Sequence, residues 1–339
     1  MASNTNGGRT ALITGGAGFI GSHLAESLLD KGYRVTIIDN LSTGRIENIA
    51  HLTENPSFHF AVDDITSDVV MDRLVSECDV IFHMAAAVGV QLIVNDPVHV
   101  IETNVLGTHA VLKAANRYRK KVLIASTSEI YGKSENVPFG EDDDRLLGPT
   151  TKARWSYSTS KAVDEFLGLA YHQQLGLPIV IFRLFNTVGP RQTGQYGMVV
   201  PRFAQQAIDG DPITVYGDGK QTRCFCDVRD TVRAIVALSE SQDAIGRVFN
   251  IGSTEEISIT DLAKLVLRQA GRSTDMTKES IRFVPYELAY GSDFEDMRRR
   301  VPDTSRIQGA LGWQPEFTLE TTIGNVIASL RQRHAVAAS

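Results

Sequence analysis

Short apolar runs alternate with amphipathic stretches along the first 185 residues. The apolar runs are rich in β-branched side chains, which is typical of strands buried on both faces. Helical periodicity lies between them, at 19–31, 98–119 and 158–175. Strands and helices that alternate in this way predict an α/β, Rossmann-type doubly wound parallel sheet with helices on both faces. The expected strands are 11–14, 35–38, 58–62, 80–84, 122–126 and 179–184, with a later one at 248–252.

The alternation changes after residue 185. Residues 213–225 predict a strand, a turn and a strand, and helical periodicity returns in shorter pieces up to residue 333. We expect residues 1–185 to form one domain, to which strand 248–252 returns. We expect residues 186–333 to form mainly a smaller, interleaved C-terminal domain. Substrate sites commonly lie in such a seam, at the carboxyl ends of the parallel strands.

A glycine-rich turn directly follows the first expected strand. Gly15, Gly18 and Gly21 lie in the segment TGGAGFIG, which opens the first expected helix. Glycines let a backbone turn tightly and approach a pyrophosphate, whose charge lies at the helix N-terminus. Asp39 ends the next strand, and a carboxylate there accepts both ribose hydroxyls and repels a 2′-phosphate. The spacing predicts a dinucleotide site that prefers NAD to NADP, a preference that the nearby Arg45 would weaken.

Tyr157 and Lys161 form a Tyr-x-x-x-Lys pair at the start of the helix expected over 158–175. At i and i+4 the two side chains share one helix face, and an ammonium beside a phenol favours the phenolate. Tyr157 is then able to take a proton from a sugar hydroxyl near neutral pH. Thr127 follows the expected strand 122–126, where its hydroxyl can hydrogen-bond the substrate oxygen.

Composition and charge exclude several classes of function. The chain has 339 residues, is 42% hydrophobic and carries a net charge of −6, which predicts a globular protein without nucleic-acid or anionic-membrane partners. Three cysteines are too few for a disulfide framework, and no apolar stretch approaches the roughly 20 residues that span a bilayer. The N-terminus lacks the features of a signal peptide, so we expect a cytoplasmic protein. The histidines and cysteines show no metal-ligand spacing, so we expect no metal.

Several segments resemble the extended short-chain dehydrogenases/reductases of the NAD-dependent nucleotide-sugar epimerase/dehydratase family. The resemblance runs from about residue 9 to residue 333, and the segments come in the family's order. It implies bound NAD in the first domain, a UDP-sugar substrate held mainly by the second, and a homodimer formed through two helices of each subunit. The segments are TGGAGFIGSH, HMAAA (83–87), TNVLGT (103–108), STSEIYG (126–132), YSTSK and RLFNTVGPR (183–191).

The resemblance also implies roles for individual residues. Asp64 and Ile65 would flank the adenine, and Asn104 would support the helix of the Tyr-Lys pair. Asn186 and Arg300 would meet the diphosphate. Further cofactor contacts are expected from Phe19, Ile20, Asn40, Ala85, Ala86, Tyr157 and Lys161, and further substrate contacts from Ser128, Arg191, Val200, Tyr216, Gln221 and Arg223.

The residues after Thr127 separate reactions that share the same first step at C4. The 4,6-dehydratases of the family that this chain resembles have Asp-Glu after the threonine. This chain has Ser128-Glu129, so the general acid expected of a dehydratase is missing. A UDP-sugar 4-epimerase needs no further acid or base, so Glu129 would have no catalytic role in such an enzyme. A non-catalytic NAD-sensing protein is another alternative, but it gains nothing from the Tyr157–Lys161 pair.

The resemblance is strongest to UDP-glucuronate decarboxylases. This family, which includes the UDP-xylose synthases, has Thr-Ser-Glu at the positions of 127–129. Segments 148–161 and 290–303 look most like the decarboxylase of the lipid A aminoarabinose pathway and the plant apiose/xylose synthases, and the latter have Cys in place of Ser128. Segment 148–161 fits the ordinary xylose-forming branch less well. Oxidation at C4 makes the C6 carboxylate a β-keto acid, which loses carbon dioxide and gives UDP-xylose or its 4-keto precursor. Arg223 would orient the carboxylate and deliver the C5 proton, directly or through a water held by Glu129.

Two plainer interpretations stay open for these residues. Glu129 is also compatible with a solvated loop carboxylate. Arg223 is also compatible with a structural ion pair to Asp227 or Asp230.

Overall fold

A seven-stranded parallel sheet forms the centre of the computed structural model, which describes residues 8–194, 198–275, 280–286, 288 and 297–337. The strand order is β11-β6-β5-β4-β1-β2-β3, and every neighbouring pair is parallel. The order reverses between β1 and β4, which opens a crevice at their carboxyl ends. The expected fold class is therefore confirmed. The strands are β1 (Thr10–Thr14), β2 (Arg34–Asp39), β3 (Phe58–Val62), β4 (Val80–His83), β5 (Lys121–Thr127), β6 (Ile179–Leu184) and β11 (Arg247–Ile251).

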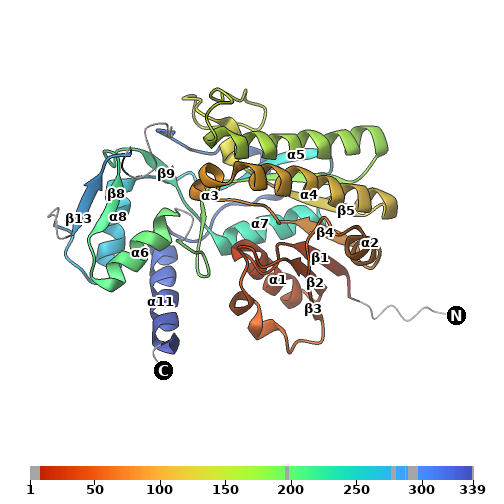
Figure 1. Ribbon diagram of the computed structural model, residues 1–339, viewed down its shortest axis with the longest axis horizontal. Coiled ribbons are helices and arrows are strands. Elements are labelled where there is room, and N and C mark those ends of the chain that lie inside the picture. Colours follow the sequence, from red (N-terminus) through yellow and green to blue (C-terminus); the bar gives the residue numbers. More distant parts are fainter. Residues whose placement is uncertain (1–7, 195–197, 276–279, 287, 289–296, 338–339) are drawn as a thin grey trace.

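Helices cover both faces of this sheet (Figure 1). Leu28 of α1 and Ile235 of α7 belong to the apolar core on one face, and Leu112 of α4 belongs to the core on the other. Both α7 and β11 follow residue 185, so the sheet layer draws on the second half of the chain. The helices are α1 (Phe19–Asp30) and α7 (Val228–Glu240) on the first face, and α2 (Asp68–Ser76), α4 (Pro97–Tyr118) and α5 (Arg154–Leu175) on the second.

A smaller unit stands beside the sheet (Figure 1). Its own core includes Phe203, Leu262 and Ile323, which come from three different helices. Two short strand pairs complete it, β8 with β13 in parallel and β9 with β12 antiparallel. The unit consists of α6 (Val199–Asp209), β8 (Ile213–Tyr216), β9 (Thr222–Cys224), β12 (Glu256–Ser258), α8 (Ile259–Gln269), β13 (Ile281–Val284) and α11 (Leu319–Ala337).

Short elements connect these layers. They are η1 (Ile46–Asn48), η2 (Ala50–Leu52), α3 (Val90–Asn95), η3 (Ser128–Tyr131), β7 (Thr187–Val188), β10 (Cys226–Asp227) and α10 (Ser305–Leu311).

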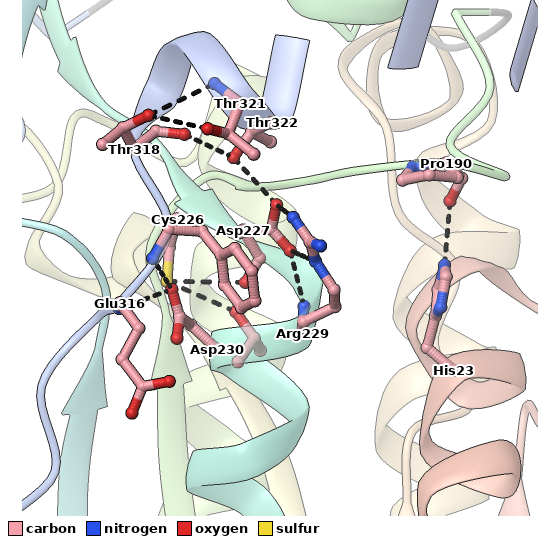
Figure 2. Close-up of polar contacts among 12 residues, drawn as sticks. His23, Pro190, Cys226, Asp227, Arg229, Asp230, Glu316, Thr318, Thr321 and Thr322 are labelled. Carbon is pink, nitrogen blue, oxygen red and sulfur yellow. Dashed lines mark hydrogen bonds and ion pairs between the residues drawn. The ribbon is translucent and has the colours of Figure 1, made fainter. Parts of the chain in front are cut away.

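Two buried carboxylates join the C-terminal segment to α7 (Figure 2). Asp227 caps the N-terminus of α7 and accepts a hydrogen bond from the Thr322 hydroxyl of α11 at 2.8 Å. Asp230 accepts the backbone N–H groups of Glu316 and Phe317, both at 3.0 Å. Because buried charges are stable only when they are hydrogen-bonded, these contacts fix the smaller unit against the sheet layer.

The structure corrects two details of the expected elements, and part of one expected segment is outside the described residues. The helix expected over 158–175 begins four residues earlier, at Arg154. The two strands expected within 213–225 do form, but they pair with other strands rather than with each other, because the intervening Gly217 and Gly219 lead the chain away. Residues 290–296 of the segment 290–303 lie outside the described residues.

Candidate active site

One cavity of about 480 Å³ lies where the carboxyl ends of the strands meet the smaller unit. Most of the site residues expected from the sequence line it, although they come from both halves of the chain. They are Gly15, Gly18, Phe19, Ile20, Gly21, Asp39, Asn40, Asp64, Ile65, Ala85, Ala86, Thr127, Glu129, Tyr157, Lys161, Asn186, Val200, Tyr216, Gln221, Arg223 and Arg300.

The turn after β1 is built for a close-approaching anion. Gly15 has φ +69°, and a Cβ atom on it would lie 2.8 Å from the backbone of Ala85. A Cβ on Gly21 would lie 2.3 Å from the carbonyl oxygen of Gly15, so helix α1 packs directly on the turn. Gly18 caps α1 without a side chain, and the first turn contains no acidic residue. The N–H groups of the first turn are thus left for an anionic ligand such as a pyrophosphate.

Asp39 ends β2 at the edge of this turn. Its carboxylate accepts the N–H of Ala17 at 3.0 Å and that of Leu41 at 2.8 Å, which fixes its orientation. Burial raises the pKa of Asp39 above its usual value, and these two hydrogen bonds act in the opposite direction. Further along the cavity, Asn40 donates to Asp64 at 2.9 Å. The donors and acceptors around the turn therefore fit the ribose and adenine of a dinucleotide.

Tyr157 lies buried near the start of α5, and its hydroxyl is hydrogen-bonded to Thr127 at the end of β5. Burial raises the pKa of Tyr157 well above its usual value, and the negative charge of Glu129 raises it further. The sequence predicted that Lys161 would favour the phenolate. In the structure the Lys161 ammonium instead donates to Asp164 at 2.7 Å, and the protein by itself holds Tyr157 as a phenol.

Asn104 of α4 joins the loop after β4 to α5. Its side-chain oxygen accepts the N–H of Ala87 at 2.8 Å, and its amide donates to the Ser160 hydroxyl at 3.1 Å. Asn104 is 1% exposed and does not line the cavity. Its contacts reach the helix that carries Tyr157 and the loop that carries Ala87.

Glu129 is held between two arginines that come from distant parts of the chain. Arg300 donates to Glu129 Oε1 at 2.9 Å, and Arg154 forms an ion pair with Glu129 Oε2. The side chains of both arginines are more than nine-tenths buried. The two positive charges hold the pKa of Glu129 far below its usual value, although burial acts in the opposite direction. Glu129 is therefore a fixed carboxylate that lines the cavity, and not a solvated loop residue.

Besides Asn104, two expected residues lie outside the wall of the main cavity. Ser128 is buried and its hydroxyl lies 3.5 Å from Arg300 Nη1. Arg191 forms an ion pair with Glu26 of α1 and lines a smaller neighbouring cavity. Burial raises the pKa of Glu26 and its hydrogen bonds lower it, with a resulting value of about 2. His23 of the same helix binds the carbonyl of Pro190 (Figure 2), so the loop before Arg191 is attached to α1.

Arg223 lines the cavity from β9. Its guanidinium donates to the carbonyl oxygen of Thr222 at 2.7 Å. Asp227 and Asp230, which the sequence left open as its partners, form ion pairs with Arg229 and Arg233.

Sequence reasoning missed several residues of the cavity wall. Arg154 precedes Tyr157 by three positions, a spacing that places both on one helix face, but the helix was expected to begin after it. Arg202 and Tyr286 also line the cavity. The Arg202 guanidinium lies 4.1 Å from the centre of the Tyr216 ring, a stacking contact that no sequence spacing indicates.

The described residues contain no group of three or more His, Cys, Asp or Glu side chains that could hold a metal ion. None of the helices in this part of the chain is long and apolar enough to cross a bilayer.

Comparison with known proteins places this site in a family. The family described as GDP-mannose 4,6 dehydratase matches residues 12–326, nearly the whole chain. The chain belongs to this family. A UDP-N-acetyl-alpha-D-glucosaminuronate decarboxylase from Bacillus cytotoxicus is 43% identical over 96% of this chain and 98% of its own length. UDP-glucuronic acid decarboxylase 1 from Arabidopsis thaliana is 37% identical over 95% of this chain and 70% of its own length.

Solved structures of the family share the fold. A UDP-glucuronic acid 4-epimerase from Bacillus cereus, in complex with UDP-glucuronic acid and NAD, superposes with a TM-score of 0.85 at 30% identity. The match covers 96% of this chain and 99% of the epimerase. Relatives of this chain thus include enzymes named as decarboxylases, epimerases and dehydratases.

Proposed function

We propose that this protein is an NAD-dependent UDP-glucuronate decarboxylase. One observation carries the proposal: Arg300 reaches Glu129 at 2.9 Å in the same cavity wall as Tyr157. A uronate brings a carboxylate close to the C4 hydroxyl on which Tyr157 would act, and a buried guanidinium is the group that recognises a carboxylate. The named decarboxylases among the relatives support the same reaction.

The residues that would hold NAD are those of the glycine turn together with Asp39, Asp64 and Ile65. Bound NAD supplies the acceptor and donor of the hydride at C4. Thr127 would position the C4 hydroxyl, and Tyr157 would take its proton. The 4-ketone then draws electrons from the bond to the C6 carboxylate, carbon dioxide leaves, and C5 is protonated. Lys161, whose ammonium donates to Asp164 beside Tyr157, would contact the ribose of the cofactor.

The contacts favour one change in the expected roles of two arginines. The sequence assigned Arg223 to the carboxylate and Arg300 to the diphosphate. We propose the reverse, because Arg300 contacts Glu129 close to Tyr157 whereas Arg223 lies on β9 of the smaller unit. The diphosphate and uridine would be bound at that end of the cavity, by Asn186, Val200, Tyr216, Gln221 and Arg223.

A UDP-sugar 4-epimerase is the second candidate. It is favoured by the structural likeness to an epimerase that binds UDP-glucuronic acid. Both candidates share the chemistry at C4 and differ in the fate of the carboxylate.

Product analysis separates the two candidates. Purified protein is incubated with NAD and, separately, with UDP-glucuronate and UDP-glucose, and the products are followed by mass spectrometry and NMR. We expect UDP-glucuronate to lose the mass of carbon dioxide if hydrogen is returned to C4 and UDP-xylose is formed. If the ketone is released instead, the product loses the mass of carbon dioxide and two hydrogens, and reduced NAD accumulates. An unchanged mass with a new C4 epimer would make the protein an epimerase. Tyr157→Phe should abolish turnover and retain NAD binding.

We also propose a homodimer formed through α4 and α5. Large apolar side chains are exposed on these two adjacent helices, among them Ile101 and Leu106 on α4 and Phe166, which is 66% exposed, on α5. Burial of such a surface between two copies is favourable. Phe166→Glu should give a monomer by light scattering, whereas the matched control Phe283→Glu, on β13 of the smaller unit, should not. A wild-type monomer would exclude this interface.

A further inference from the structure

Asp164 of α5 has a place that the proposed reaction does not yet explain. It lies three positions after Lys161, a spacing that puts both side chains on one face of the helix. The Lys161 ammonium donates to Asp164 Oδ2 at 2.7 Å, and the two side chains are 2% and 0% exposed. Lys161 lines the main cavity, whereas Asp164 is not part of its wall. The pair therefore fixes a buried carboxylate directly beside the site.

Two other ionisable groups lie near this pair. Burial lowers the pKa of His83 on β4 to about 3, and the charge of Lys161 acts in the same direction, so His83 is neutral. Glu165, the neighbour of Asp164, accepts two hydrogen bonds from the Arg183 guanidinium, at 3.0 and 2.8 Å. Burial raises the pKa of Asp164, and the ion pair with Lys161 lowers it. Asp164 and Lys161 are thus opposite charges whose effects on the cavity oppose each other.

A carboxylate at this place acts on the cofactor that the cavity would hold. The oxidised nicotinamide ring carries a positive charge and the reduced ring carries none, so a nearby negative charge favours the oxidised form. The field of Asp164 extends to the end of the cavity where the sugar would react, because its charge raises the pKa of Tyr157 there. Lys161, which would contact the ribose of the cofactor, has the opposite effect and favours the reduced form.

We propose that Asp164 makes the site favour oxidised over reduced NAD, so that the hydride is returned before the product leaves. The inference rests on the proposed function, because it takes the 4-ketone left by decarboxylation as the acceptor. The hydride removed from C4 goes back to C4 of this ketone, and Tyr157 returns the proton to its oxygen. UDP-xylose then leaves without net oxidation, and no external oxidant is needed. Without Asp164, the charge of Lys161 would stabilise the reduced form, and more of the ketone would accumulate.

The first test measures the preference for oxidised NAD without any sugar. The protein is equilibrated with mixtures of oxidised and reduced NAD, and the reduced fraction of the bound cofactor is determined by chromatography after denaturation. The pH is neutral or mildly acidic, so that the Lys161 amine is protonated. Asp164→Asn removes the charge and keeps an oxygen that accepts the hydrogen bond from Lys161. We expect this variant to shift the preference toward reduced NAD by about 6- to 30-fold, the range for a unit charge that acts over roughly 8–15 Å at an effective dielectric constant of about 20.

A matched control comes from another helix. Asp261 and Lys264 of α8 also form an ion pair three positions apart, at 3.1 Å, but both side chains are exposed. Asp261→Asn changes the net charge of the protein by the same amount and should leave the preference as it is. An unchanged preference in Asp164→Asn, or an equal shift in Asp261→Asn, would overturn the inference. If Asp164→Asn does not fold, Asp164→Ser replaces it, with the same expected shift and the same refuting result.

The second test follows the product. With UDP-glucuronate, we expect the wild-type protein to release mainly UDP-xylose and Asp164→Asn to release a larger share of its product as the 4-ketone, with a matching amount of reduced NAD. A wild-type protein that releases only the ketone would overturn the inference. An unchanged share of ketone in Asp164→Asn would overturn it as well, because the charge would then have no effect on the return of the hydride.

The inference and the proposed function fail in different ways. A protein that releases no carbon dioxide but shows the expected shift in cofactor preference would lose the proposed function, and Asp164 would still be the residue that favours oxidised NAD. A protein that decarboxylates UDP-glucuronate without this shift would keep the proposed function and lose the role of Asp164.

Discussion

Replacement of Asn104 tests how the site is assembled. Asn104→Ala removes three hydrogen bonds, which join Asn104 to the N–H of Ala87 at 2.8 Å, to the carbonyl of Ala87 at 3.3 Å and to the Ser160 hydroxyl at 3.1 Å. Each such bond contributes about 1 kcal/mol net, and a buried N–H left without an acceptor costs about 1–3 kcal/mol. We therefore expect the free energy of unfolding to fall by about 2–4 kcal/mol.

A matched substitution on the same helix provides the control. Asn116 also lies in α4, but it accepts only a 3.3 Å hydrogen bond from Arg119 near the helix end. Asn116→Ala gains the same helix propensity as Asn104→Ala, so the propensity term cancels in the comparison. The difference between the two variants in urea unfolding then reports the buried contacts of Asn104 alone.

Turnover adds a second readout for Asn104. Because Asn104 holds the helix of Tyr157 against the loop of Ala87, its loss should reduce kcat by about 10-fold or more through misplacement of the phenol. Equal unfolding free energies and equal kcat values for Asn104→Ala and Asn116→Ala would refute the reasoning. They would mean that packing alone positions α5.

Two further predictions concern other buried polar groups. Thr322→Val should lower the free energy of unfolding by about 1–2 kcal/mol, because the Thr322 hydroxyl donates to the buried carboxylate of Asp227 at 2.8 Å (Figure 2). The control Thr321→Val, on the exposed side of α11, should change this free energy by less than about 0.5 kcal/mol. Equal effects of the two variants in urea unfolding would contradict the prediction. Glu129→Gln should lower the pH at which kcat/KM rises, because the charge of Glu129 raises the pKa of Tyr157 and the variant removes that charge. A pH–rate profile that moves toward higher pH would refute the assignment of Tyr157 as the titrating base.

The sheet could be predicted from the sequence because its signals are local. Each strand buried on both faces is a short continuous apolar run, and the helix expected to end before Gly176 does so, with that glycine in the left-handed conformation at φ +66°. The start of the same helix has no such signal, since Ala153 offers no side chain to cap it. The missing cap moved the expected start past Arg154 and removed that arginine from the candidate residues.

The charge arrangement could not be predicted, because it depends on contacts between segments far apart in the chain. Arg300 meets Glu129 only after the chain returns from the smaller unit to the sheet. The Tyr157–Lys161 spacing predicts a lowered pKa for Tyr157. In the folded chain burial raises that pKa, and the Lys161 ammonium donates to Asp164. Spacing along one helix indicates which groups are near each other, and it does not indicate which partner an ammonium chooses.

The state of Glu129 limits the part that it can play in the reaction. Its pKa is held far below the usual value by Arg154 and Arg300, so near neutral pH it has no proton to give to C5. A role as direct acid is therefore excluded, and the proton must come from another group or from a water that the cluster orients. The same carboxylate raises the pKa of Tyr157 and so opposes the first step of the reaction. A group that hinders the first step and cannot supply the later proton is explained by its ion pairs with Arg154 and Arg300, which orient both guanidiniums in the cavity wall.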